Sequence, residues 1–159
     1  MDDDQKQFSV MVRQNKNTIF TVCYMFSKDQ EEVNDLFQEV LIRLWQGFDN
    51  YKGNSKERTW IYRVALNTCI SFDRKKRRHN KKQVYIGDDL FGCNEHDSQQ
   101  TEVLHKRITR LRPLDRAIVL LWLEDISYEE IGSIIGITAK NVSVRLYRIR
   151  EQLKNMSND

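Results

Sequence analysis

The sequence predicts an all-α protein made of two small helical domains joined by a flexible linker. Apolar residues recur every three or four positions along most of the chain, which is the spacing of one face of a helix. The 159 residues include one proline and six glycines, and 31% are charged, a composition that suits a helical protein. We place the two domains at residues 1–78 and 101–159, with the linker at residues 79–100.

Composition also limits where the protein works. No apolar run approaches the roughly 20 residues that a membrane span needs, and the acidic start MDDDQKQ does not resemble a signal peptide. The three cysteines, Cys23, Cys69 and Cys93, are odd in number and far apart, which argues against a disulfide framework. We therefore expect a cytoplasmic protein without membrane insertion.

The most regular apolar pattern lies at residues 33–48, and a similar spacing at residues 8–26 predicts a helix before it. Its apolar side chains form one stripe: Val33, Leu36, Phe37, Val40, Leu41, Leu44, Trp45 and Phe48. The opposite face, with Ile42 among its members, carries Asp35, Gln38, Glu39 and Arg43. Asp29 and Glu32 have the spacing of a capping box, which predicts the start of this helix.

A third helix is predicted after the polar stretch at residues 49–58, with Thr59 as its N-cap. It leads into the run RKKRRHNKK, residues 74–82, in which seven of nine residues are Lys or Arg. Cations bind phosphates, and aromatic rings stack on unpaired bases. The basic run, together with Trp60, Tyr62, Arg63 and Asn67 before it, therefore indicates a surface for nucleic acid.

Residues 83–100 have no sustained period and an acid-rich middle, which predicts the linker. Cys93 and His96 form a C-x-x-H pair, but no second pair of metal ligands lies at suitable spacing. We therefore expect neither a metal nor a cofactor.

The C-terminal domain is expected to begin with a short helix at residues 101–111. Pro113 is well placed as the first residue of the following helix, because a proline there loses no helical hydrogen bond. The core candidates of that helix are Leu114, Ile118, Leu121 and Trp122.

The most specific local pattern lies at residues 127–138. Ser127 and Glu130 form a capping box, and the helix that they open ends at Gly136, a residue suited to a left-handed turn. Thr138 is positioned to cap another helix, and Gly132 is small enough to let that helix pack closely. Two helices joined by a glycine turn within about 20 residues predict a helix-turn-helix.

The second helix of this motif, residues 139–154, has a basic surface. Its N-terminal half would enter the major groove, and Arg148 and Arg150 would reach bases or phosphates. Its inward candidates are Val142, Leu146, Ile149 and Leu153. A helical hairpin that binds protein is the alternative interpretation.

Together these segments resemble a bacterial RNA polymerase sigma factor of the extracytoplasmic-function (ECF) type. DLFQEVLIRLW at residues 35–45 resembles the family's D-L-x-Q-E-x-F-x-x-x-W helix. Residues 48–78 resemble its promoter-melting segment, and residues 127–153 resemble the helix-turn-helix that reads the −35 element. The resemblance covers residues 8–155 in the family's order.

The resemblance implies a role for each surface. The polymerase-binding residues, which would dock on the clamp helices of the largest subunit of core RNA polymerase, would be Asp35, Gln38, Glu39 and Arg43. The −10 DNA residues would be Tyr51, Lys52, Trp60, Tyr62, Arg63, Asn67, Ser71, Arg74 and Lys75. The −35 DNA residues would be Thr138, Lys140, Asn141, Ser143, Val144, Arg145, Tyr147 and Arg148. The partners implied are core polymerase, promoter DNA and an anti-sigma protein.

Three positions depart from the family pattern. Ser71 stands where the family often has Asp or Asn, and Ser143 stands where a basic residue is common. Gly132 stands in place of a usual Ala, which lowers helix propensity by up to about 1 kcal/mol.

The main alternative function is a helix-turn-helix regulator that binds duplex DNA without polymerase. It accounts for residues 101–155 but leaves residues 33–78 as a dimerisation bundle. No acid pair, metal cluster or nucleophile with a base lies at motif spacing, so we expect no enzymatic activity.

Overall fold

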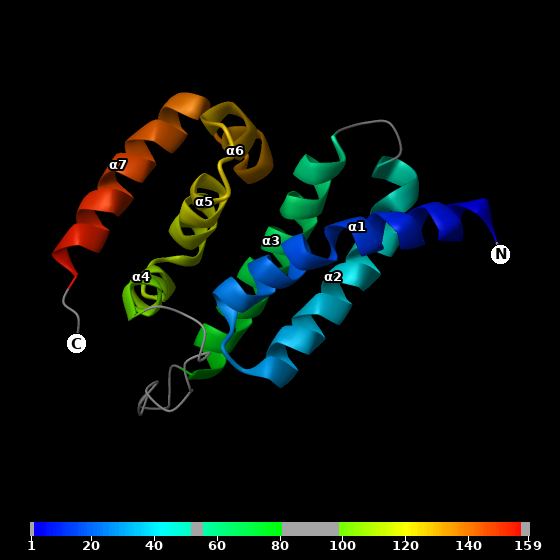
Figure 1. The fold of residues 1–159 in the computed structure, drawn as a ribbon, viewed down its shortest axis with the longest axis horizontal. Helices are drawn as coiled ribbons and strands as arrows, with labels where there is room; N and C mark the ends of the chain where they lie inside the picture. The colour runs from blue at the N-terminus through cyan, green and yellow to red at the C-terminus, as the bar shows by residue number, and fades with distance from the viewer. Residues whose placement is uncertain (1, 52–55, 81–98, 157–159) are drawn as a thin grey trace. The chain divides into compact units, whose positions relative to one another are not determined.

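The computed structural model describes residues 2–51, 56–80 and 99–156, and these contain seven helices and no strand. The helices are α1 (Asp3–Phe26), α2 (Gln30–Tyr51), α3 (Glu57–Asn80), α4 (Gln99–Thr109), α5 (Pro113–Leu123), α6 (Tyr128–Ile135) and α7 (Ala139–Asn155), as labelled in Figure 1. The predicted all-α class is confirmed. None of the described helices is both long and apolar enough to span a membrane.

The chain divides into two compact units, a first unit at Met1–Ser71 and a second unit at Phe72–Asp159. The boundary between them falls inside α3, whereas the domain boundary after residue 78 stays a prediction. Most of the predicted linker, residues 81–98, lies outside the described residues.

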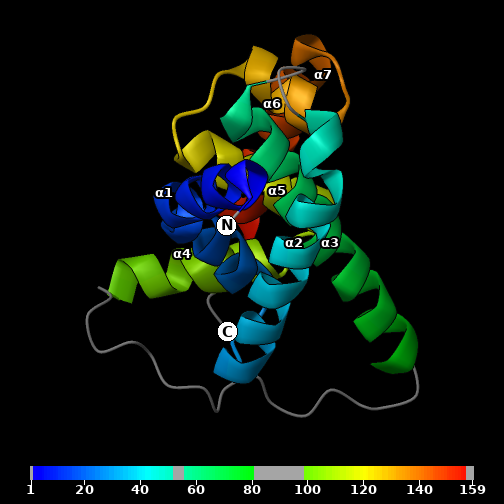
Figure 2. The ribbon, with the colours of Figure 1, turned by 90° about the vertical axis from the view of Figure 1, so that its right-hand side faces the viewer.

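In the first unit, α1 and α2 pack against each other (Figure 1 and Figure 2). Phe20 of α1 stacks flat on Phe37 of α2, with ring centroids 4.0 Å apart. The buried members of the stripe are Val33, Leu36, Phe37, Val40, Leu44 and Phe48. Leu41 is half-buried and Trp45 is 44% exposed, so the prediction that Trp45 belongs to the core is wrong. Trp45 lies at the edge of the stripe, where the ring of Phe8 makes an edge contact with it at 5.0 Å between centroids.

The starts of α2 and α3 differ in how well they could be predicted. Asp29 caps α2 as expected, because its Oδ1 accepts the N–H of Glu31 at 3.0 Å. The predicted cap at Thr59 is wrong, since α3 already begins at Glu57 and Thr59 is buried in its first turn. The carbonyl of Lys56 accepts the N–H of Trp60 and begins the helical ladder.

Two cysteines join α1 to α3 in the core of the first unit. Cys23 and Cys69 are both free thiols with no exposed surface. A hydrogen bond between the two thiols, together with burial, raises the pKa of Cys69, and the same bond lowers the pKa of Cys23.

In the second unit, a buried arginine closes the turn between α4 and α5. Arg116 is 5% exposed, and its Nη2 donates to the carbonyls of Thr109 at 2.6 Å and Leu111 at 3.2 Å. Burial lowers the pKa of Arg116, since desolvation disfavours the charged guanidinium. The predicted core residues that are buried here are Ile118, Leu121, Val142, Leu146 and Ile149, while Leu114, Trp122 and Leu153 are half-buried.

The predicted helix-turn-helix is confirmed as α6, a turn and α7. Ser127 Oγ accepts the N–H of Glu130 at 3.2 Å, and Thr138 Oγ1 accepts the N–H of Asn141 at 3.1 Å. Gly136 adopts φ +92°, a left-handed conformation that favours glycine. Both helix starts and the turn therefore follow from the local sequence.

The glycine at position 132 is required by the same turn. Its carbonyl accepts the N–H groups of Gly136 at 2.7 Å and Ile137 at 3.0 Å. A Cβ atom built on Gly132 would lie only 2.5 Å from the carbonyl oxygen of Ile137. The close approach expected from the small residue is confirmed, and an alanine would push the turn away.

We predict that Gly132→Ala destabilises the second unit. Alanine gains up to about 1 kcal/mol of helix propensity, but overpacking typically costs about 1–3 kcal/mol. Gly47→Ala in α2 is the matched control, because its Cβ would meet only Trp60 Cζ2 at an ordinary 3.6 Å. Thermal denaturation followed by circular dichroism should give a lower midpoint for Gly132→Ala and an unchanged or higher one for Gly47→Ala. Equal midpoints for the two variants would show that the turn relaxes freely.

Candidate nucleic-acid and protein interfaces

One face of α7 is exposed along most of its length, although the opposite face is buried. Val142, Leu146 and Ile149 fill the core of the second unit. The exposed residues among the −35 candidates are Thr138, Lys140, Asn141, Ser143, Val144, Tyr147 and Arg148. Tyr147 is 70% exposed, an unusual position for a large aromatic ring.

The exposed face of α7 carries residue types that can contact duplex DNA. Lys140 and Asn141 lie in its first turn, next to the capping Thr138. An asparagine amide can make two hydrogen bonds to adenine in the major groove, and apolar groups such as Val144 can contact the thymine methyl. The first turn of the second helix is the part that enters the groove in this motif.

Two arginines of α7 have partners inside the second unit. Arg145 is half-buried, and its Nη1 lies 3.6 Å from Asp115 Oδ1 of α5. The guanidinium of Arg150, which the sequence suggests for DNA contact, instead lies over the ring of Trp122 at 5.3 Å. Arg148 forms no ion pair with any described residue.

An aromatic cluster lies where α3 begins. The rings of Tyr51 and Trp60 stack at 4.2 Å with an interplanar angle of 5°, and Phe48 lies 6.4 Å from Trp60. Burial, and then the charge of Glu57, raise the pKa of Tyr51 above its ordinary value. Lys52, the neighbouring −10 candidate, lies outside the described residues.

Most −10 candidates on α3 share one face of the helix. Trp60, Arg63, Asn67, Ser71 and Arg74 follow one another at steps of three or four residues, with Lys75 beside the last. Arg63, Asn67, Arg74 and Lys75 are exposed, while Trp60 and Ser71 are half-buried. The stripe thus begins with an aromatic ring, continues with an amide and ends in cations.

Tyr62 does not belong to this stripe. It is 6% exposed and packs in the core of the first unit, because it lies about 200° around the helix from Trp60 at 3.6 residues per turn. Tyr62 is therefore not available at the surface of this structure, and its contact with DNA stays a prediction. Helical spacing from Trp60 would have identified its orientation.

The polar face of α2 is exposed as expected for a docking surface. Asp35, Gln38, Glu39 and Arg43 are all exposed, and Arg43 Nε lies 3.2 Å from Glu39 Oε1 one helical turn away. Two large apolar side chains lie beside them, Ile42 at 50% exposure and Trp45 at 44%. Sequence analysis had assigned Trp45 to the core and so missed it as a surface residue.

Among the described residues, no group of three or more His, Cys, Asp or Glu side chains could hold a metal ion. Cys93 and His96, the C-x-x-H pair, lie in the part of the chain that the structure does not describe.

Comparison with known families finds two matches along the chain. The family model for Sigma-70 region 2 matches residues 11–79, and the model for Sigma-70, region 4 matches residues 101–153. The first match contains α2 and nearly all of α3, and the second contains the helix-turn-helix.

Several curated relatives are similar over nearly the whole chain. The ECF RNA polymerase sigma factor SigM of Bacillus subtilis is 30% identical, with 89% of this chain and 90% of SigM covered. SigW of the same organism is 27% identical, with 98% and 91% covered. SigE of Mycolicibacterium smegmatis is 29% identical, and the chain spans 59% of the length of that relative.

Solved structures show the same fold. The sigma factor RpoE of Bartonella quintana, in complex with the anti-sigma factor NepR, matches with a TM-score of 0.77 at 21% identity over 94% of this chain and 95% of that one. CnrH, in complex with the cytosolic domain of CnrY, matches with a TM-score of 0.70 at 18% identity over 94% and 86%. With two family models in the expected order and a 30% identical relative covered almost end to end, this chain belongs to the ECF sigma factors of RNA polymerase.

Proposed function

We propose that this protein is a promoter-specificity subunit of bacterial RNA polymerase, which directs the core enzyme to −35 and −10 elements and begins transcription there. The observation that carries the proposal is the presence of regions 2 and 4 of the sigma family, in that order, in one chain. The protein acts by binding, in the cytoplasm, and has no catalytic activity of its own.

The polar face of α2 binds the clamp helices of the largest polymerase subunit. A solvated face needs no exposed isoleucine, whereas Ile42 and Trp45 flank the Glu39–Arg43 pair and supply apolar area beside charge. Protein interfaces combine such an apolar, often aromatic, centre with charged residues at the rim. This surface therefore suits a helical protein partner with complementary charges.

The stripe on α3 binds the −10 element as a single strand. Removing a base from the duplex costs a few kcal/mol of stacking, which contacts in the complex must offset. Arg74 and Lys75 form no ion pair with any described residue, so their charges are available to phosphates, whereas Arg77 is paired with Asp73 at 2.8 Å. Asn67, exposed in the middle of the stripe, can hydrogen-bond an unpaired base edge.

The exposed face of α7 binds the −35 element as a duplex. Lys140, Asn141, Val144 and Tyr147 make the base contacts, because they extend from the face opposite the buried core. The caps fix where α6 and α7 begin, and the glycine turn between them sets the orientation of this face.

An anti-sigma protein holds this sigma factor inactive. The support comes from two solved relatives of the same fold, one captured with an anti-sigma factor and the other with a cytosolic domain of another protein. A protein that covers the α2 and α7 faces would block polymerase and promoter together.

The proposal is tested by measuring promoter binding with and without core polymerase. A sigma factor should bind its promoter weakly alone and tightly in the holoenzyme, because polymerase sets the distance between its two DNA-binding surfaces. A stand-alone helix-turn-helix regulator should bind its duplex tightly as a dimer and gain nothing from core polymerase. The second result would reject the proposed function.

We predict that Glu39→Lys weakens binding of core polymerase at least about tenfold, since like charges placed across an interface cost several kcal/mol. The fold should persist, because Glu39 is exposed. The double variant Glu39→Arg with Arg43→Glu serves as control, because it keeps an ion pair on the helix but reverses the order of its charges. Both variants should be defective in pull-down of core enzyme by the full chain. If the double variant binds core polymerase as well as the wild type, the Glu39–Arg43 pair stabilises α2 and Glu39 makes no specific contact with polymerase.

We predict that Asn141→Ala lowers discrimination between the promoter and a random duplex by about 1–3 kcal/mol, the loss expected for a bidentate base contact. Asn155→Ala at the other end of α7 is the matched control, because Asn155 is also exposed and is far from the first turn. Competition between promoter and random duplex for binding to holoenzyme measures the discrimination of each variant. An equal loss on promoter and random duplex would assign Asn141 to the DNA backbone instead.

A further inference from the structure

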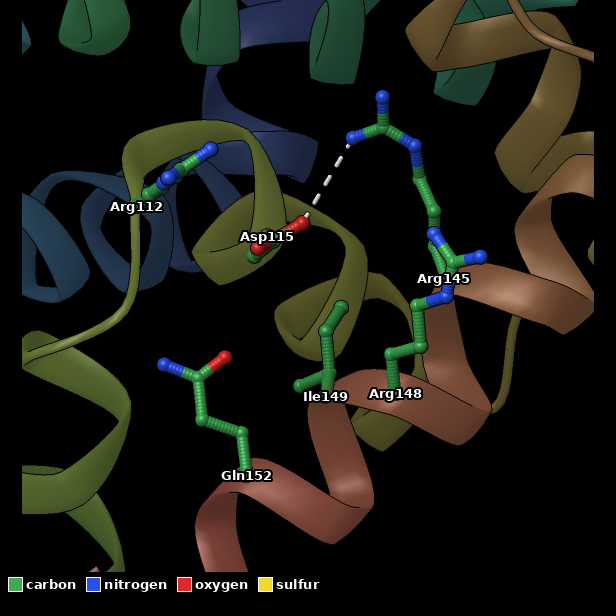
Figure 3. A pocket seen from close by; sticks show the side chains of 6 residues that line it. All are labelled: Arg112, Asp115, Arg145, Arg148, Ile149 and Gln152. Carbon is green, nitrogen blue, oxygen red and sulfur yellow. Dashed lines mark ion pairs between the residues drawn. The ribbon is translucent and has the colours of Figure 1, made fainter.

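A hollow of about 360 Å³ lies on the second unit between the start of α5 and the middle of α7 (Figure 3). Its lining residues are Arg112, Asp115, Arg145, Arg148, Ile149 and Gln152. Figure 3 shows Arg112 and Gln152 on one side of Ile149, and Arg145 and Arg148 on the other. Three guanidinium groups, one carboxylate and one amide therefore lie around the single apolar side chain of Ile149.

The hollow is suited to an anion. Its formal charge is three arginines less one aspartate, which leaves two positive charges. Asp115 is already engaged by Arg145 at 3.6 Å, and that contact holds Arg145 at the rim. Arg112 and Arg148 have no ion pair among the described residues, and both are exposed. Planar guanidinium groups with free donors bind phosphate oxygens in pairs.

The position of the hollow on α7 indicates which anion it meets. Arg145, Arg148, Ile149 and Gln152 follow the i, i+3, i+4, i+7 spacing of one helical stripe. The neighbouring stripe carries Lys140, Val144 and Tyr147, and Arg148 borders both. A DNA strand whose bases meet the stripe with Lys140, Val144 and Tyr147 carries its phosphates along the edge of the groove. Those phosphates would lie beside the stripe that lines the hollow.

We propose that this hollow binds one phosphodiester group of the DNA backbone next to the −35 element, with Arg112 and Arg148 as its charged ligands and Gln152 as a neutral donor. The inference rests on the proposed function and adds residues outside the recognition helix to its DNA surface. Arg112 lies directly before α5, so its contact would connect a second element of the unit to the DNA. Together with the contacts of α7, this contact would fix the angle at which α7 enters the groove. Such a contact adds affinity without reading sequence.

Arg112→Gln in the full chain, assembled with core polymerase, tests the assignment. The variant should bind both the promoter and a random duplex about tenfold more weakly at low salt, as expected for loss of a charge-assisted phosphate contact. The slope of log affinity against log salt should fall by about 0.9, the value for one phosphate on duplex DNA. Lys106→Gln is the matched control, because it removes an exposed cation of the second unit that does not line the hollow.

Replacing single phosphates of the −35 duplex by neutral methylphosphonates locates the partner. One position should weaken wild-type binding about tenfold and have no further effect on Arg112→Gln, because both changes remove the same contact. If Arg112→Gln keeps the affinity and salt slope of Lys106→Gln while the wild type binds its promoter, the inference is wrong and the proposed function stands. A wild type that binds no promoter, with or without polymerase, overturns both.

A small-anion site is the remaining outcome. Titration of the free chain with inorganic phosphate, followed by the arginine side-chain signals in nuclear magnetic resonance, separates it from a DNA contact. If phosphate binds in a manner that Arg112→Gln abolishes, and DNA binding is unchanged in that variant, the hollow serves a small anion and the DNA assignment is wrong.

Discussion

The carbonyl of Gly132 accepts two backbone N–H groups, from Gly136 and Ile137, and the turn returns so closely that a Cβ atom at residue 132 has no room. The orientation of α7 relative to α6 depends on this contact. The caps at Ser127 and Thr138 fix where the two helices begin, but neither sets the angle between them. Because one face of α7 is buried, that angle also decides which side chains of α7 are exposed. In the proposed function, sequence specificity therefore depends on a backbone contact that touches no base.

In the first unit, too, each helix buries one face in the core and exposes the other, but the exposed side chains differ. One face of α2 fills the core, and the opposite face keeps an ordered ion pair, Glu39–Arg43, beside exposed Ile42 and Trp45. In the same unit, α3 buries Ile61, Ala65 and Leu66 and exposes Arg63 and Asn67. The stripe on α3 continues past the unit boundary to the cations Arg74 and Lys75. In the proposed function, a protein partner binds the first face and single-stranded DNA binds the second. Both functional faces are thus the solvent sides of helices whose other sides hold the unit together.

Local chemistry in the sequence was sufficient for the fold class and for the helix-turn-helix. Ser127, Gly136 and Thr138 each act through neighbours within four residues, so their roles could be predicted without the structure. The misplaced residues depend on tertiary packing. Trp45 has helical spacing with the core but lies at its edge, and Tyr62, an aromatic near the basic run, is buried.

Contacts between helices were beyond the sequence for the same reason. Nothing local indicates that Arg150 lies over Trp122 or that Arg145 pairs with Asp115, since the two residues of each pair belong to different helices, α7 and α5. The hollow around Arg112 likewise combines residues of two helices, so it appears only once they are packed. The sequence predicts which side chains bear charge, and packing decides which of them remain available to a ligand.

The central claim is that this chain gives core RNA polymerase the ability to start at particular promoters. In-vitro transcription with purified core enzyme, with and without the full chain, on a library of promoter fragments tests it most directly. We predict defined start sites that appear only with the protein and share two sequence elements upstream. Transcription that is unchanged by the protein, together with tight binding of a duplex by the protein alone, would contradict the account and favour a stand-alone regulator.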